Sequence, residues 1–185
     1  MQADQGRLAL VTIMGRLAVG EQDALNELYQ RTSAKLFGVC LRILNDREEA
    51  EDVLQDVYLT VWRRADRFDS ERASPITWLA TIARNRSIDR LRQIGRRGGD
   101  HPVDAAVDVA DDGPDAFQRL ADSDDGRRLS ECLGNLDGRT KSSIAAAFYG
   151  GLTYEQLAER LSVPLGTIKS RIRRGLIKLR ECLSQ

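Results

Sequence analysis

Residues 151–183 read GLTYEQLAERLSVPLGTIKSRIRRGLIKLRECL and contain the strongest local folding signals of the chain. Thr153 is a good helix N-cap residue, and Gln156 stands three positions later, where a capping box requires Gln or Glu. This start predicts a short helix over residues 154–161. A tight turn follows, and Pro164 suits the first turn of the next helix. Two helices separated by such a turn indicate a helix-turn-helix.

The second helix of this motif is expected over residues 164–180, and its two sides differ. Four apolar residues recur at helical spacing and are expected to pack on the domain: Ile168, Ile172, Leu176 and Leu179. The other side offers donors and cations that suit the DNA major groove and its phosphates: Thr167, Lys169, Ser170, Arg171, Arg173 and Arg174. Of these we expect Arg171 and Arg174 at phosphates. The alternative is an ordinary solvated basic face.

A second basic helix is expected to start at Ser74 and Pro75, an N-cap and first-turn pair, and to end near residue 93 among arginines and glycines. Its mixture of cations, an aromatic ring and an amide suits a nucleic-acid strand whose bases are exposed. The candidate residues are Trp78, Arg84, Asn85, Arg86, Asp89 and Arg90. Two alternatives stay open: Trp78 as core packing, and Asn85 in a structural hydrogen bond.

The helix expected over residues 46–62 has an acidic rather than a basic exposed side. Its apolar residues form a full stripe at steps of three and four: Ala50, Val53, Leu54, Val57, Tyr58, Val61 and Trp62. Opposite the stripe are Asp52, Gln55 and Asp56. Exposed acids of this kind can meet a basic partner surface, or can simply keep the protein in solution.

The charge of the chain is balanced overall, with 28 basic and 28 acidic residues, but it is unevenly distributed. Basic blocks at residues 84–97 and 160–180 flank an acidic segment, 100–125, that holds nine aspartates and one arginine. This pattern, with helical periodicity on both sides, predicts an all-α fold of two small helical domains, 1–95 and 127–185. A flexible acidic linker, 96–126, is expected to join them.

Several classes of function find no support in the sequence. The three cysteines are far apart, so no metal site is expected, and no cofactor motif or phosphate loop occurs. The single histidine, His101, falls in the acidic segment. No run is long enough to cross a membrane, and residues 8–14 lack the features of a signal peptide. We therefore expect a cytoplasmic protein that is not an enzyme and has no small-molecule substrate.

Three stretches of the chain together resemble the extracytoplasmic-function (ECF) sigma factors. They are DREEAEDVLQDVYLTVWRRADRFD (46–69), SPITWLATIARNRSIDRLR (74–92) and residues 151–183. The resemblance implies two helical domains, with core RNA polymerase, promoter DNA and an often membrane-anchored anti-sigma factor as partners. It also implies that residues 46–64 dock on the clamp coiled coil of the polymerase, and that residues 164–180 read the −35 element. Residues 75–92 would recognise and open the −10 element, with Asn85 at a pocket for a flipped base.

The resemblance gives two further expectations. The acidic linker would lie in a basic channel of the polymerase, as the family's linker does. Cys132 and Cys182 lie on apolar stripes near the two ends of the C-terminal domain, and a similar cysteine pair occurs in the SigK-like branch of the family. A reversible disulfide there would affect anti-sigma binding. The alternative is two reduced, buried cysteines.

A stand-alone helix-turn-helix regulator is the competing interpretation. Such a protein would use only residues 151–183 and would leave the acidic helix and the second basic helix without a role. Binding to core polymerase separates the two interpretations.

Overall fold

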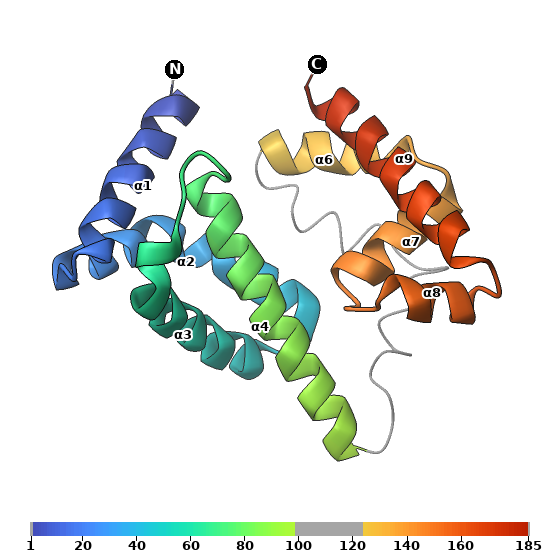
Figure 1. Cartoon of the computed structure of the whole chain (residues 1–185), viewed down its shortest axis with the longest axis horizontal. Helices are drawn as coiled ribbons and strands as arrows, with labels where there is room; N and C mark the ends of the chain where they lie inside the picture. The colour runs from blue at the N-terminus through green and yellow to red at the C-terminus, as the bar shows by residue number, and fades with distance from the viewer. Residues whose placement is uncertain (1, 99–123, 185) are drawn as a thin grey trace. The chain divides into compact units, whose positions relative to one another are not determined.

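The computed structural model describes residues 2–98 and 124–184, with side chains described for 5–95 and 127–184. The regular structure in these ranges is entirely helical, as predicted (Figure 1). The helices are α1 (Gln2–Ala18), α2 (Gln22–Leu44), α3 (Arg47–Arg64), the 3₁₀ turn η1 (Ala65–Arg67), α4 (Pro75–Gly98), α6 (Asp124–Gly134), α7 (Gly138–Phe148), α8 (Tyr154–Arg160) and α9 (Leu165–Leu183). The chain divides into two compact units, Met1–Ile94 and Gly95–Gln185.

Helices α4 and α6 each extend three residues into the segment assigned to the linker from the sequence, 96–126. The continuation of α4 through Gly95 to Gly98 corrects the expectation that the helix ends near residue 93. A single glycine costs a helix only about 1 kcal/mol, which the preceding turns can offset. The rest of the acidic segment, His101 included, lies outside the described residues.

Two adjacent residues form the sharp connection between α2 and α3. Asn45 ends α2 with a left-handed backbone, φ 51°, and its N–H donates to the Leu41 carbonyl at 2.8 Å. Asn tolerates this conformation better than most residues. Asp46 then starts α3, because its carboxylate accepts the Glu49 N–H at 3.0 Å. The two helices consequently pack against one another along their lengths.

A buried hydrogen-bonded pair, Thr32 of α2 and Tyr58 of α3, lies in the interface between these helices. Their side-chain oxygens are 2.7 Å apart. The Thr32 hydroxyl donates its proton to the Leu28 carbonyl, so the Tyr58 hydroxyl is the donor to Thr32. Burial raises the pKa of Tyr58 to about 12. The pair satisfies two polar groups inside an apolar interface and so fixes the register of α2 on α3.

In the second unit, α7 and α9 cross at Gly175. A Cβ at Gly175 would lie 2.4 Å from Cγ2 of Thr140 and 2.8 Å from Cδ1 of Ile144, so any larger residue would force these side chains to shift. The buried face of α9 consists of Ile168, Ile172, Gly175 and Leu179. Leu176, expected on this face from the sequence, is instead half exposed. At 3.6 residues per turn Leu176 lies about 70° from the centre of this face, at its edge, whereas Gly175 lies near the centre.

Candidate nucleic-acid interface

Helix α9 presents a polar, positively charged surface at its N-terminal half. Lys169, Ser170, Arg173 and Arg174 are exposed, while Ile168 and Ile172 are buried on the opposite side. Thr167 is half-buried in the first turn, and its N–H donates to the Pro164 carbonyl at 2.9 Å. Pro164 itself occupies the N-cap position, so the helix starts at Leu165, one residue after the expected start. The exposed side has the donors and cations that base edges and phosphates accept.

Arg171 lies apart from the other candidate residues of α9. Its side chain is half-buried and turns back onto α7, where Nη1 donates to Oγ of Ser143 at 3.4 Å. Ser143 is itself buried. Of the six residues predicted to contact DNA on this helix, four are exposed on one surface and Thr167 lies at the edge of that surface. Arg171 packs within the domain.

Helix α8 and the turn after it position α9. Both hydrogen bonds of the predicted capping box are present: the Gln156 N–H donates to Oγ1 of Thr153 at 3.2 Å, and the Thr153 N–H donates to Oε1 of Gln156 at 2.8 Å. Ser162 adopts a left-handed backbone, φ 51°, and the Val163 N–H returns to the Ala158 carbonyl at 3.0 Å. These bonds fix the direction in which the chain enters α9.

Helix α4 has an exposed polar side that begins beside an aromatic contact. The half-buried ring of Trp78 meets the ring of Phe68 edge-on, with centroids 5.7 Å apart. Asn85 and Asp89 are exposed two and three turns further along. Nη1 of Arg84 donates to Oδ1 of Asn85 at 3.2 Å, so this bond uses the amide oxygen and not the amide N–H groups. Trp78 thus takes part in packing, while Asn85 is accessible.

Two arginines expected to contact DNA, Arg86 and Arg90, bond to α3 instead. Nη2 of Arg86 donates to Oγ1 of Thr60 at 2.9 Å. The guanidinium of Arg90 binds both carboxylate oxygens of Glu49, with Nη2 3.0 Å from Oε1. This carboxylate raises the pKa of Arg90 further. Both side chains hold α4 against α3, which gives them a structural role that the sequence pattern does not reveal.

The predicted acidic side of α3 is exposed. Asp52, Gln55 and Asp56 all face away from the apolar stripe. Leu59, one turn after Gln55, lies on the same side and is 52% exposed. An exposed leucine next to Gln55 and Asp56 gives this side an apolar centre with polar neighbours, an arrangement that is typical of protein-binding surfaces.

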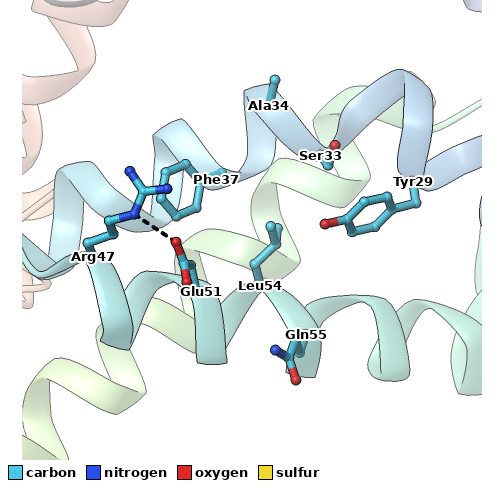
Figure 2. A pocket seen from close by; sticks show the side chains of 8 residues that line it. All are labelled: Tyr29, Ser33, Ala34, Phe37, Arg47, Glu51, Leu54 and Gln55. Carbon is cyan, nitrogen blue, oxygen red and sulfur yellow. Dashed lines mark hydrogen bonds and ion pairs between the residues drawn. The ribbon is translucent and has the colours of Figure 1, made fainter.

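A groove of about 380 Å³ lies between α2 and α3, next to Gln55. Figure 2 shows the rings of Tyr29 and Phe37 on α2 and the ion pair of Arg47 and Glu51 on α3. In that pair Nε of Arg47 donates to Oε1 of Glu51 at 2.8 Å. The other lining residues are Ser33, Ala34 and Leu54. The groove thus adds an aromatic wall to the acidic side of α3.

A disulfide joins Cys132 of α6 to Cys182 of α9, with Cα atoms 5.8 Å apart and a sequence separation of 50. It lies in a small core with Leu133, Leu136 and Leu179. The third cysteine, Cys40, is buried in the first unit, and burial raises the pKa of its thiol. The bond ties the first and last helices of the second unit together.

Comparison with known proteins identifies the family. Sigma-70 region 2 matches residues 28–97, and Sigma-70 region 4 matches residues 132–181. The ECF RNA polymerase sigma factor SigK of Mycobacterium ulcerans is 39% identical over 180 residues, which cover 94% of this chain and 93% of the relative. SigK of Mycobacterium tuberculosis is 40% identical over the same coverage. The chain belongs to the ECF RNA polymerase sigma factors.

The surfaces described above fall inside the two matched regions of this sigma factor. Region 2 contains the acidic side of α3, the groove and all candidate residues of α4, whereas region 4 contains α8 and the candidate residues of α9. Cys132 is the first residue of the region 4 match, and Cys182 follows its last residue. An alternative sigma factor therefore accounts for all three surfaces with one function.

Two solved structures also match the sigma factor over most of its length. Rhodobacter sphaeroides SigE, in complex with the anti-sigma ChrR, is 34% identical, with 95% of this chain and 98% of that chain covered and a TM-score of 0.47. The sigma factor RpoE of Bartonella quintana, in complex with the anti-sigma factor NepR, is 26% identical, with 89% and 98% covered and a TM-score of 0.39.

Sequence reasoning missed Leu59 and the aromatic wall of the groove, Tyr29 and Phe37. The signal for Leu59 was available, because an apolar residue one turn from Gln55 interrupts an otherwise polar side. Among the described residues, no cluster of His, Cys, Asp and Glu could hold a metal ion. No helix in the described ranges has the length and apolar character needed to cross a membrane.

Proposed function

We propose that this sigma factor binds core RNA polymerase through α3, reads the −10 element through α4 and reads the −35 element through α9. The observation that carries the proposal is the exposure of three chemically different helix surfaces in the two sigma-70 regions. The sides of α4 and α9 offer amide, hydroxyl and cationic groups, while α3 offers two acids and an exposed leucine. Nucleic acid complements the first two surfaces, and a basic protein surface complements the third.

The polymerase-docking surface consists of Asp52, Gln55, Asp56 and Leu59, bordered by the α2–α3 groove. A coiled coil with basic residues could place them against Asp52 and Asp56 while apolar residues cover Leu59. Association would be fast because of the charges, and its lifetime would depend on the apolar centre. The proposed partner of this docking surface is the clamp coiled coil of the polymerase, which the family resemblance implies for residues 46–64.

At the −10 element, Asn85 is the proposed base reader. Its amide can donate to the edge of an unstacked base, and Arg84 orients it by donating to the Asn85 oxygen. Arg86 and Arg90 hold α4 on α3 and are proposed as positioning residues rather than as DNA contacts. Asp89 is exposed on the same side and would favour base N–H groups over phosphates.

At the −35 element, α9 would enter the major groove with Lys169, Ser170 and Arg173 toward base edges. Arg174 would hold a phosphate, and Thr167 would contact DNA at the start of the helix. Arg171 supports the reader from within the domain. A helix held by its buried isoleucines presents these groups in fixed positions, so little conformational entropy is lost on binding.

Regulation is proposed to involve an anti-sigma factor, the partner that membership of this family implies. The Cys132–Cys182 disulfide is a candidate control point, because its reduction would free α6 from the end of α9. An anti-sigma surface that spans these helices would then bind with a different affinity. The sigma factor is proposed to act in the cytoplasm, where the polymerase carries out the chemistry.

The test measures equilibrium binding of labelled full-length protein to purified core polymerase. Replacing Asp52→Asn and Asp56→Asn together should weaken binding by about 1–3 kcal/mol, or roughly 5- to 150-fold. The matched control, Glu155→Gln with Glu159→Gln on α8, changes the net charge equally and should bind as wild type. Equal losses in both variants would show that overall charge, and not this surface, governs the association.

A further inference from the structure

The second unit contains a basic cleft that the proposed promoter contacts do not use in full. It lies between the start of α7 and the middle of α9 and has a volume of about 350 Å³. Four cationic side chains line it: Arg139, Arg171, Arg174 and Lys178. Its other lining residues are Leu136, Asp137, Thr140 and Gly175. Arg139 and Lys178 have no role in the surfaces described above.

The cleft is electrostatically unbalanced, because its one acid is already engaged. The Asp137 carboxylate caps α7 by accepting the Thr140 N–H at 2.9 Å, and this hydrogen bonding lowers the pKa of Asp137, with a smaller effect from Lys178 and Arg171. Within the described ranges, none of the four cations is ion-paired to an acid. The cleft therefore carries an excess of positive charge that attracts an anion.

Gly175 keeps this cleft narrow. Its missing side chain lets α9 approach Thr140 closely, so the cations of the two helices converge on the same space. Lys178 lies one turn after Arg174 on α9. Arg139 lies in the first turn of α7, on the opposite wall of the cleft. Converging cations on two rigid helices suit a chain of several negative charges better than a single ion.

The chain itself contains such a polyanion directly before α6. Residues 100–123 hold seven aspartates and one arginine, a net charge of −6. Residues 127–184 of the same unit hold eleven basic and five acidic residues, a net charge of +6. We propose that the aspartate-rich segment docks in the α7–α9 cleft of the free protein. There it competes with DNA phosphates for Arg174.

The length of the chain permits this contact. Helix α6 has 11 residues, which corresponds to roughly 16 Å. Asp115 precedes the start of α6 by nine residues, and an extended chain of that length spans up to about 30 Å. The segment around Asp111, Asp112 and Asp115 can thus return along α6 to the cleft. Tethering keeps its effective concentration near the cleft on the order of millimolar, so weak charge pairing suffices.

The direct test is zero-length carbodiimide cross-linking of the full-length monomer at low salt, followed by peptide mass spectrometry. The reagent joins carboxylates to lysines that touch them. Lys178 lies in the cleft, while Lys169 on the exposed side of α9 and Lys35 on α2 are internal controls. The aspartates at 104–115 should link to Lys178 on the order of tenfold more than to either control, and 0.5 M salt, about 4 Å of screening length, should abolish the difference.

Equal yields at the three lysines would overturn the proposal. So would links confined to pairs of chains, because the occupant would then be a second copy. Neither result depends on polymerase or on a promoter. The docking proposal can therefore fail while the proposed function stands, and the proposed function can fail while the docking proposal stands.

A double-mutant cycle measures the functional consequence. One change neutralises five aspartates to Asn: Asp104, Asp108, Asp111, Asp112 and Asp115. The other is Arg139→Gln with Lys178→Gln. Binding of the full-length variants to a labelled double-stranded DNA is followed by fluorescence anisotropy, and thermal melting checks that each variant folds.

Neutralising the aspartates should strengthen DNA binding on the order of tenfold in the wild-type cleft and clearly less in the altered cleft. An identical gain in both backgrounds would mean a general charge effect and would contradict docking. A loss of DNA binding in the cleft variant that is unaffected by the aspartates would assign the cleft to DNA phosphates instead, which also contradicts the proposal.

Discussion

Arg90 of α4 and Glu49 of α3 form a two-point ion pair across 41 residues of sequence. Nη2 and Nε of the arginine bind the two carboxylate oxygens of the glutamate, and both side chains are about seven-tenths buried. A planar guanidinium matches a carboxylate in this geometry, and a lysine cannot. The pair fixes α4, which carries the proposed −10 reader Asn85, on α3, which carries the proposed polymerase-docking surface.

Replacing Arg90→Leu should lower the free energy of unfolding, because Glu49 keeps a partly buried charge without its partner. Urea unfolding followed by circular dichroism measures the loss. Glu48→Gln, an exposed change in the same turn as Glu49, is the control and should stay within about 0.5 kcal/mol of wild type. A stable Arg90→Leu protein that has lost promoter binding would instead make Arg90 a DNA contact.

Gly175→Ala should destabilise the second unit, because the new Cβ would overlap Thr140 and Ile144. Overpacking of this kind typically costs about 1–3 kcal/mol. Gly166→Ala, in the first turn of the same helix, meets no atom within 4 Å and should be neutral or stabilising. Thermal melting of both variants gives the comparison. A Gly175→Ala protein as stable as Gly166→Ala would mean that α7 and α9 cross less closely.

Removing the disulfide should also destabilise the second unit. The bond closes a loop across 50 residues, for which loop entropy gives about 4 kcal/mol, while measured losses are commonly 2–4 kcal/mol. The double change Cys132→Ala and Cys182→Ala should therefore melt at a lower temperature, and reductant should lower the melting temperature of wild type but not of the variant. If reductant has no effect on wild type, the bond contributes nothing to stability in solution.

The sequence was sufficient for the elements whose signals are local. The capping box of α8, the cap at Asp46 and the apolar stripe of α3 each depend on residues within one or two turns, and the structure contains them all. The exposed acids of α3 followed from the same stripe.

Long-range pairings were beyond that reasoning. Arg90, Arg86 and Arg171 look like DNA contacts by composition, and only the packing of α4 on α3 and of α9 on α7 gives them partners inside the protein. Leu176 was expected on the buried side because leucine is usually buried. The close crossing of α7 and α9 instead places Gly175, the preceding residue, on that side. The apolar and polar faces of a helix can be predicted from its sequence. The neighbouring helix that packs against each face is set by the tertiary structure and cannot be predicted in this way.

Within α9, Arg173 and Arg171 should respond differently to truncation. Arg173→Ala removes an exposed group proposed to reach a base, and should weaken binding to promoter DNA by about 1–3 kcal/mol with little change in stability. Arg171→Ala removes the contact with Ser143 and should lower stability more than it lowers affinity. Binding and melting measured on the same preparations distinguish the two, and the reverse order of effects would exchange their roles.

The buried phenol of Tyr58 predicts a loss of stability at high pH. Its pKa is raised to about 12 in the folded protein, against about 10 in the unfolded chain. A raised pKa means that the contribution is fully present below about pH 10 and is lost as the pH rises toward about 12. Urea unfolding at several pH values should show this loss in wild type and a smaller one in Tyr58→Phe. Parallel curves for the two proteins would indicate that the hydroxyl is solvated.

Run-off transcription with purified core RNA polymerase tests the assignment of function most directly. Templates are genomic fragments upstream of candidate genes, and the start sites of the transcripts are mapped with and without the full-length chain. The account predicts new, discrete start sites that require the chain, that disappear with Asp52→Asn/Asp56→Asn and that weaken with Asn85→Ala. Transcripts that start at the same positions with and without the chain would contradict it.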